Sequence, residues 1–116
     1  MRLLVILALG LVIGSCSRDV PNMICEAELT VQGQMTVEGP SLRQYEATDV
    51  FRVASGRLYH RYRGREEYFY NDIREVEVGR YVSGHMMFVM DHNNSHGYVV
   101  IAGHPDWRVM YLNCKS

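Results

Sequence analysis

The sequence predicts an all-β fold, a small antiparallel meander of about seven or eight strands that closes, or nearly closes, into a barrel or sandwich. Residues 25–32 alternate between apolar and polar side chains, which is the period of a half-buried strand. Turn-forming residues recur along the rest of the chain, and no stretch after the first fifteen residues sustains a helical period. The chain has 116 residues, and this length predicts one domain.

The first and last predicted strands each present a cysteine to the core. In residues 25–32 the core face consists of Cys25, Ala27, Leu29 and Val31. In residues 107–114 it consists of Met110, Leu112 and Cys114. If the two cysteines are bonded, the strands that carry them must be neighbours, because a disulfide joins Cα atoms only about 4.4–6.8 Å apart. Terminal strands that meet favour a closed sheet.

The predicted turns pair the middle strands into hairpins. The segments joined in this way are 49–54 with 57–63 through Ser55-Gly56, 67–70 with 73–78 through Asn71-Asp72, and 86–90 with 98–102 through residues 91–97. Residues 103–106 then turn the chain into the last strand. Gly39-Pro40 interrupts the pattern, and Ser41 with Gln44 fits a capping box for one or two helical turns, or else the segment is a loop.

The first fifteen residues have the features of a secretory signal peptide. Arg2 supplies a positive start, and residues 3–13 are apolar except for Gly10. Polar residues follow from Ser15 onwards, so the apolar run is too short for a membrane span, which needs about 20 residues.

The tetrapeptide Ile13-Gly14-Ser15-Cys16 resembles the lipobox of bacterial lipoproteins. The resemblance implies that Cys16 carries a diacylglyceryl group and becomes the acylated mature N-terminus. Residues 1–15 are then the signal peptide, 16–23 a lipid-anchored linker and 24–116 the β domain. Ser17 and Arg18 lack the aspartate that favours retention in the inner membrane, which implies an outer-membrane protein facing the periplasm. The alternative is an ordinary signal cut after Ser17, which gives a secreted or periplasmic protein.

Whether Cys16 is lipidated or cleaved off with the signal peptide, it cannot form a disulfide, and Cys25 and Cys114 remain as a pair. An exported chain enters an oxidising compartment, where we expect this pair to form a disulfide. The alternative is two buried free thiols.

The charge of the mature chain is close to balanced. Without Arg2, eleven basic residues accompany thirteen acidic ones, a net charge of −2 with neutral histidine. This balance gives no reason to expect nucleic acid as a partner. The expected partners are the membrane, through the N-terminal lipid, and an envelope protein.

Residues 91–96, with the sequence DHNNSH, are the most concentrated polar cluster. Asp91, His92 and His96 are candidate ligands for zinc or copper. The alternative is a solvated turn, because Asp, Asn and Ser form local hydrogen bonds in turns. The spacing matches no known ligand motif, so we expect neither a metal site nor a cofactor.

A second cluster follows in residues 57–63. Arg57, Tyr59, Arg61 and Arg63 alternate onto one strand face and are candidates for binding phosphate or a nucleic-acid strand by charge and stacking. The alternative is an exposed face that is neutralised across the sheet. The acids available for this are Glu66, Glu67, Glu75 and Glu77.

No catalytic motif is present in the sequence, and we expect no catalytic residues. The predicted function is that of a non-enzymatic cell-envelope lipoprotein with a binding or structural role. One alternative comes from Ser55-Gly56-x-x-Tyr59, which resembles the Ser-Gly loop of lysozyme-inhibitor lipoproteins. That family implies a small barrel that inserts this loop into the lysozyme cleft. A third alternative is a barrel that carries a small ligand or a metal.

Overall fold

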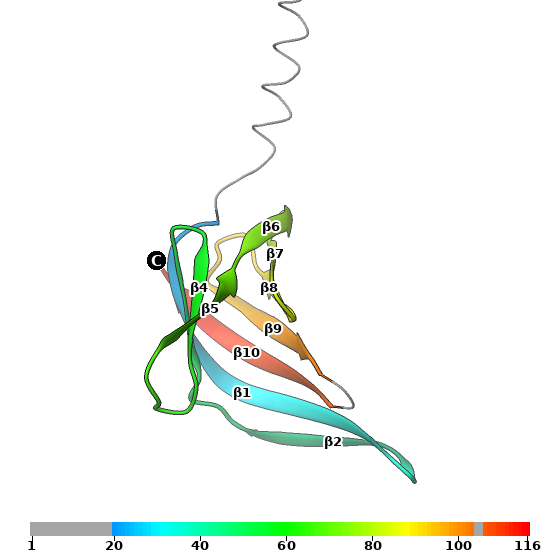
Figure 1. Cartoon of the computed structure of the whole chain (residues 1–116). Helices are drawn as coiled ribbons and strands as arrows, with labels where there is room; N and C mark the ends of the chain where they lie inside the picture. Colours follow the sequence, from blue (N-terminus) through cyan, green and yellow to red (C-terminus); the bar gives the residue numbers. More distant parts are fainter. Residues whose placement is uncertain (1–19, 104–105) are drawn as a thin grey trace, which may run out of the picture.

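The computed structural model describes residues 20–103 and 106–116, which form ten β-strands and no helix (Figure 1). The predicted all-β class is therefore confirmed. The strands are β1 (Met23–Thr36), β2 (Gly39–Glu46), β3 (Val50–Ala54), β4 (Arg57–Arg61), β5 (Tyr68–Asp72), β6 (Arg74–Glu77), β7 (Arg80–Ser83), β8 (Met86–Met90), β9 (His96–Ala102) and β10 (Trp107–Lys115). Within the described ranges no helix is long and apolar enough to cross a membrane.

The strands belong to one antiparallel sheet that curls into a nearly closed barrel. Their order is β5-β4-β3-β1-β10-β9-β8-β7-β6, and β2 pairs with β1 outside this path. Residues 23–26 of β1 pair with β3, whereas residues 29–36 pair with β2 on the same edge. The second half of β1 therefore extends with β2 as an arm beyond the closed part of the barrel (Figure 1).

The sheet ends, β5 and β6, meet at a seam that is not sealed by a backbone ladder between them in the described structure. Side chains bridge this region instead. The Ser83 hydroxyl donates to the Asp72 carbonyl at 2.8 Å, and the His85 N–H donates to the Tyr70 hydroxyl at 3.1 Å. These bonds hold the seam together at one end while the other end stays open.

The predicted tight turn at Asn71-Asp72 is wrong. Both residues belong to β5, and the chain bends at Ile73, which is buried and separates β5 from β6. Because β5 pairs with β4 and β6 pairs with β7, the two strands are not a hairpin. The chain crosses the barrel seam here, which local turn composition does not reveal.

Each of the eight predicted strand positions carries a strand, and β2 and β7 are additional. The segment expected to be helical or a loop is β2. Its side chains are mostly exposed, so it shows no apolar alternation. Pro40 is compatible with this position, because an edge strand leaves part of its backbone unpaired.

A bulge in β1 makes part of the predicted core face wrong. Between Ala27 and Leu29 the pairing with β10 shifts by one residue. Because side chains alternate between faces, the shift turns Leu29 away from the core and brings Thr30 into it, where Thr30 is fully buried. Gln32 consequently lies on the inner face of the sheet.

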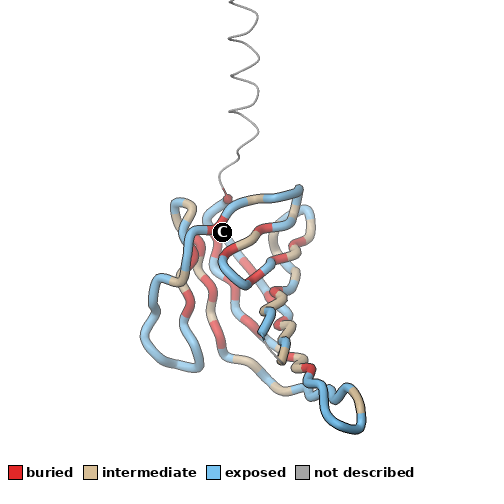
Figure 2. Tube along the Cα trace, turned by 45° about the vertical axis from the view of Figure 1, so that its right-hand side comes forward, coloured by how far each residue is buried: buried red, intermediate tan, exposed pale blue. Residues whose placement is uncertain are grey.

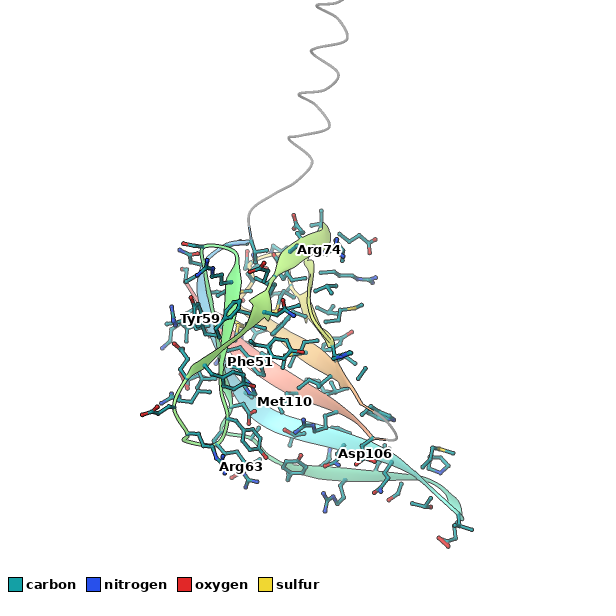
Figure 3. The ribbon with its side chains drawn as sticks, in the orientation of Figure 1. Phe51, Tyr59, Arg63, Arg74, Asp106 and Met110 are labelled. Carbon is teal, nitrogen blue, oxygen red and sulfur yellow. A yellow bond between two sulfur atoms is a disulfide. The ribbon has the colours of Figure 1, made fainter. Side chains whose placement is uncertain are left out.

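The predicted disulfide is confirmed. Cys25 and Cys114 lie directly opposite each other on β1 and β10, with their Cα atoms 4.0 Å apart, and their sulfurs are bonded. Both cysteines are buried. Figure 2 marks the buried positions along the strands, and the core contains bulky side chains such as Phe51 and Met110, which Figure 3 labels.

The proposed linker overlaps the folded domain. Val20 and Met23 are only 4% and 3% exposed and pack in the core. The Asn22 side chain accepts a hydrogen bond from the Ser55 N–H at 3.0 Å. The signal peptide and Cys16 lie outside the described residues.

The predicted two-residue turn at Ser55-Gly56 is confirmed between β3 and β4. Both residues have positive φ, 52° and 75°, as a type I′ turn requires. A Cβ on Gly56 would meet no atom within 4 Å, so a substitution there tests backbone conformation alone.

We therefore expect Gly56→Ala to lower the free energy of unfolding by about 1–2 kcal/mol, the cost of a left-handed conformation for an L-residue. Gly56→Asn should lose less, because asparagine tolerates this conformation. Urea unfolding of both variants checks the order. Equal stability of Gly56→Ala and wild type would contradict it.

Candidate functional site

The inner face of the sheet carries a lateral row of polar residues at the open end of the barrel. Strand register places Arg43 of β2 beside Gln32 of β1, Gln32 beside Arg108 of β10, and Arg108 beside Ile101 of β9. Neighbouring strands lie about 4.8 Å apart, so the two arginines are about 10 Å apart at the backbone. Gln32 lies between them only because of the β1 bulge.

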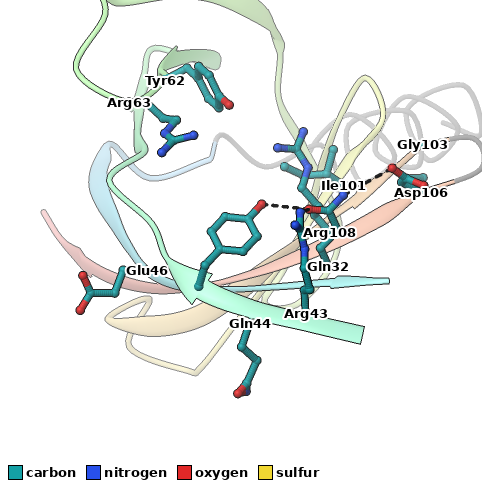
Figure 4. Close-up of a pocket in the computed structure, with 12 residues that line it drawn as sticks. Gln32, Arg43, Gln44, Glu46, Tyr62, Arg63, Ile101, Gly103, Asp106 and Arg108 are labelled. Atoms are coloured by element: carbon teal, nitrogen blue, oxygen red, sulfur yellow. Dashed lines mark hydrogen bonds between the residues drawn. The ribbon is translucent and has the colours of Figure 1, made fainter. Parts of the chain in front are cut away.

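The opposite wall of this groove comes from the loop after β4. Tyr62 and Arg63 of that loop enclose, with the polar row, a cavity of about 840 Å³ (Figure 4). Arg63 has a φ of 47°, so the strand direction is lost where β4 ends. We call this cavity the polar groove.

Hydrogen bonds fix the floor of the polar groove. The Tyr45 hydroxyl and Arg43 Nη2 both donate to Gln32 Oε1, each at 3.2 Å, and Gln32 Nε2 donates to Asp106 Oδ2 at 3.4 Å. The amide of Gln32 is thereby held in one orientation. Tyr45 itself lines the groove.

The polar groove has an excess of positive charge. Arg43, Arg63 and Arg108 line it, and none of them makes an ion pair with a residue that the structure describes. Two carboxylates, Asp106 and Glu46, also line the groove. Three guanidinium groups therefore accompany two carboxylates, an excess of one positive charge.

A second cavity of about 490 Å³ adjoins the polar groove and shares Tyr62, Ile101 and Arg108 with it. Met86 and Met110, which are almost fully buried, line this cavity. We call it the apolar cavity. Both volumes fall within the roughly 300–1,000 Å³ that is typical of small-ligand sites.

A hydrogen-bonded triad lines the apolar cavity, and two of its members, Asp49 and His60, are buried while Tyr68 is 47% exposed. His60 Nε2 lies 2.8 Å from Asp49 Oδ2, and His60 Nδ1 lies 2.9 Å from the Tyr68 hydroxyl. Both ring nitrogens of His60 therefore have a hydrogen-bonding partner. Phe51 stacks on the imidazole, with ring centroids 4.6 Å apart.

This triad provides oriented hydrogen-bonding groups at the wall of the cavity. Burial raises the pKa of Tyr68, with smaller contributions from Tyr70 and Asp49. The phenol therefore stays protonated at neutral pH and is a poor nucleophile. Its bond to His60 orients the Tyr68 oxygen at the cavity wall.

The metal-ligand candidates lie close together, Asp91 and His92 in the β8–β9 loop and His96 at the start of β9. Asp91 Oδ1 accepts from the Ser95 N–H at 2.9 Å, and Asp91 Oδ2 accepts from the Ser95 hydroxyl at 3.0 Å. His96 Nδ1 is 3.9 Å from Asp91, and His92 is exposed. In the described parts of the chain no three His, Cys, Asp or Glu side chains are grouped closely enough to hold a metal ion.

The hydrogen bonds of Asp91 in this loop predict that the stability of the fold depends on pH. The Ser95 N–H, followed by other donors in the loop, lowers the pKa of Asp91. A depressed folded-state pKa adds stability above the unfolded value of about 3.9, and this stability is lost as the pH falls through the folded value. We expect the Tm of Asp91→Ala to lie below that of wild type, with the largest difference near neutral pH and a smaller one below about pH 4. Thermal unfolding at several pH values measures it, and Asn93→Ala is the control, with an effect that should not vary with pH.

The four arginine-cluster candidates do not share one surface. Arg57, Tyr59 and Arg61 lie on the outer face of β4, opposite the buried Leu58 and His60. Arg63 lies after the strand end and lines the polar groove (Figures 3 and 4).

The outer face of β4 is occupied by neighbouring side chains. The Arg52 guanidinium lies 4.3 Å from the Tyr59 ring centroid and pairs with Glu67 at 2.7 Å. This hydrogen bond lowers the pKa of Glu67. The ring of Tyr59 therefore already stacks with an arginine of its own sheet.

Sequence patterns did not identify Gln32, Arg43, Tyr45 or Arg108 as site residues. One signal was present for Arg108, because it shares the predicted core face with Met110, Leu112 and Cys114. A charged residue on a core face is unusual and marks the point where that face opens to solvent.

Three comparisons with known proteins return no match: no family model, curated protein or solved structure is similar to this chain. Its function is therefore inferred from its own residues.

Proposed function

We propose that this protein is a lipid-anchored component of the bacterial cell envelope that binds a ligand non-enzymatically in the polar groove and apolar cavity. The observation that carries the binding role is the excess of guanidinium groups in a groove at the open end of the barrel. Cations that no described carboxylate neutralises are available to a partner.

The position of the first described residues supports an anchored orientation. Pro21 lines a small cavity with Val78 and Asp91, so the chain enters beside the β6–β7 turn and the β8–β9 loop. In Figure 3, Arg74 lies at this end of the barrel, whereas Arg63 and Asp106 lie at the other end. Five residue steps separate Cys16 from Pro21 and span at most about 18 Å, so a lipid on Cys16 would hold the Pro21 end close to the bilayer and leave the polar groove facing outward.

The anchor is tested by Cys16→Ser in the full chain. We expect wild type in the membrane fraction with an acylated mature N-terminus, because two or more acyl chains give stable attachment. Cys16→Ser should lack acylation by mass spectrometry. If the mature wild-type protein began at an unmodified Arg18, the lipid anchor would be wrong, but the protein would still be exported.

The binding role is tested by photocrosslinking in native envelope. A photoreactive phenylalanine analogue replaces Arg43 in the polar groove or, as a control, Arg80, which pairs with Glu77 near the other end. We expect a specific adduct at position 43 and none at position 80. Adducts at position 80 only would show that the partner binds near the other end of the barrel and not in the polar groove.

Lysozyme inhibition is a second candidate function, and the projecting Ser55-Gly56 turn favours it because Ser55 is exposed at a hairpin tip. This turn lies at the chain-entry end, where Asn22 binds Ser55. A lipid anchor would hold it near the bilayer, so we rank this function below groove binding. A lysozyme activity assay with excess protein tests it, and full activity would exclude it.

A further inference from the structure

We propose that the ligand is an amphipathic anion, with its charged head in the polar groove and its hydrocarbon body in the apolar cavity. The inference rests on the proposed binding function and adds the chemical class of the ligand. It follows from two adjoining cavities of opposite character that share Arg108.

The head of such a ligand is matched by the three arginines. Arg43 and Arg108 flank Gln32 on adjacent strands, and Arg63 faces them from the loop after β4. Guanidinium groups bind carboxylate, sulfonate or phosphate oxygens through charge-assisted hydrogen bonds. Asp106 and Glu46 disfavour an anion, but they are two carboxylates against three cations, and Asp106 Oδ2 already accepts from Gln32.

The hydrocarbon body is matched by the apolar cavity. Met86, Met110 and Ile101 present flexible and branched apolar side chains there. Of the charged and imidazole side chains in this cavity, Asp49 and His60 are bonded to each other, and Arg108 is shared with the polar groove. The others, Arg65, Glu66 and His85, are exposed. Burying an alkyl chain against the methionines is favourable by the hydrophobic effect.

The position of Arg108 determines the orientation of the ligand. Arg108 borders both cavities, whereas Arg43 and Arg63 border only the polar groove. A head group bonded to Arg108 therefore places the next carbon atoms at the entrance of the apolar cavity.

The probes are decanoate, the neutral decanol, the cationic decylammonium and the hydrophilic anion pyrophosphate. The protein is the whole mature chain, residues 16–116 with Cys16→Ser, exported behind a cleavable leader so that no detergent is needed. Calorimetry should detect decanoate, with decanol, decylammonium and pyrophosphate at least about tenfold weaker, because each lacks one of the two interactions. In the series from butanoate to decanoate, affinity should rise by about two- to fourfold per CH₂.

The matched variants are Arg108→Gln and Arg80→Gln. Arg108→Gln should weaken decanoate binding by about tenfold or more, because it removes a charge-assisted bond. Arg80→Gln removes an equal charge outside both cavities and should leave affinity unchanged. Circular dichroism and an intact disulfide confirm that each variant is folded.

The remaining outcomes separate this inference from the proposed function. Equal affinity for decanoate and decanol, or pyrophosphate binding as tight as decanoate, would overturn the amphipathic anion while keeping a binding groove. No binding of any probe, with a crosslink still formed at position 43, would likewise overturn the ligand class alone. No binding and no crosslink would overturn both.

Discussion

Replacing both bridge cysteines, as Cys25→Ala with Cys114→Ala, is expected to lower the free energy of unfolding by about 4–5 kcal/mol. The disulfide closes a loop with a sequence separation of 89 residues, almost the whole domain. In the chain-entropy model, so long a loop restricts the unfolded chain strongly. A domain of this size has only about 5–15 kcal/mol in total, so the double variant should be close to unfolding at 37 °C.

Urea unfolding with and without a reducing agent measures this effect. The oxidised wild type and Cys16→Ser should unfold alike, because Cys16 is not part of the bridge. Reduced wild type should resemble the double alanine variant. A loss below about 1 kcal/mol would show that the folded domain does not depend on the bridge.

Phe51→Ala is expected to lower the free energy of unfolding by about 3–5 kcal/mol. Phe51 is fully buried, stacks on His60 and packs edge-on against Phe88, with centroids 5.5 Å apart. Truncation would leave a cavity beside the Asp49–His60 pair and expose the imidazole to an empty space. The lost packing and the weaker support for this buried pair both lower the free energy of unfolding.

Phe69→Ala is the matched control, since Phe69 is 51% exposed on the outer side of β5. Its loss should cost less than about 1 kcal/mol. Chemical denaturation of the two variants measures the difference, and near-ultraviolet circular dichroism reports on the aromatic packing. Equal losses would mean that Phe51 does not organise the core.

The sequence predicted the strands of the core but not the groove residues. Residues 57–61 alternate as expected, because Leu58 and His60 are buried and their neighbours are not. Arg43 lies in β2, whose exposed side chains carry no alternating pattern. Its meeting with Arg108 depends on pairing across three strands, which short-range composition does not encode.

The triad was missed for a related reason. Asp49 precedes β3, His60 lies in β4 and Tyr68 begins β5, so each residue looks ordinary in its own segment. They meet because β3, β4 and β5 are consecutive in the sheet. The register of those hairpins brings the side chains within hydrogen-bonding distance.

By itself, the sequence determined the all-β class, the Ser55-Gly56 turn and the cysteine pair. Local side-chain period and turn chemistry act over a few residues, and two buried cysteines in terminal strands constrain how the chain closes. The tertiary structure alone decided which side of β1 faces inward after the bulge, how β2 is attached and which arginines share a groove. These features depend on strand register between distant segments, where a shift of one residue reverses every side chain.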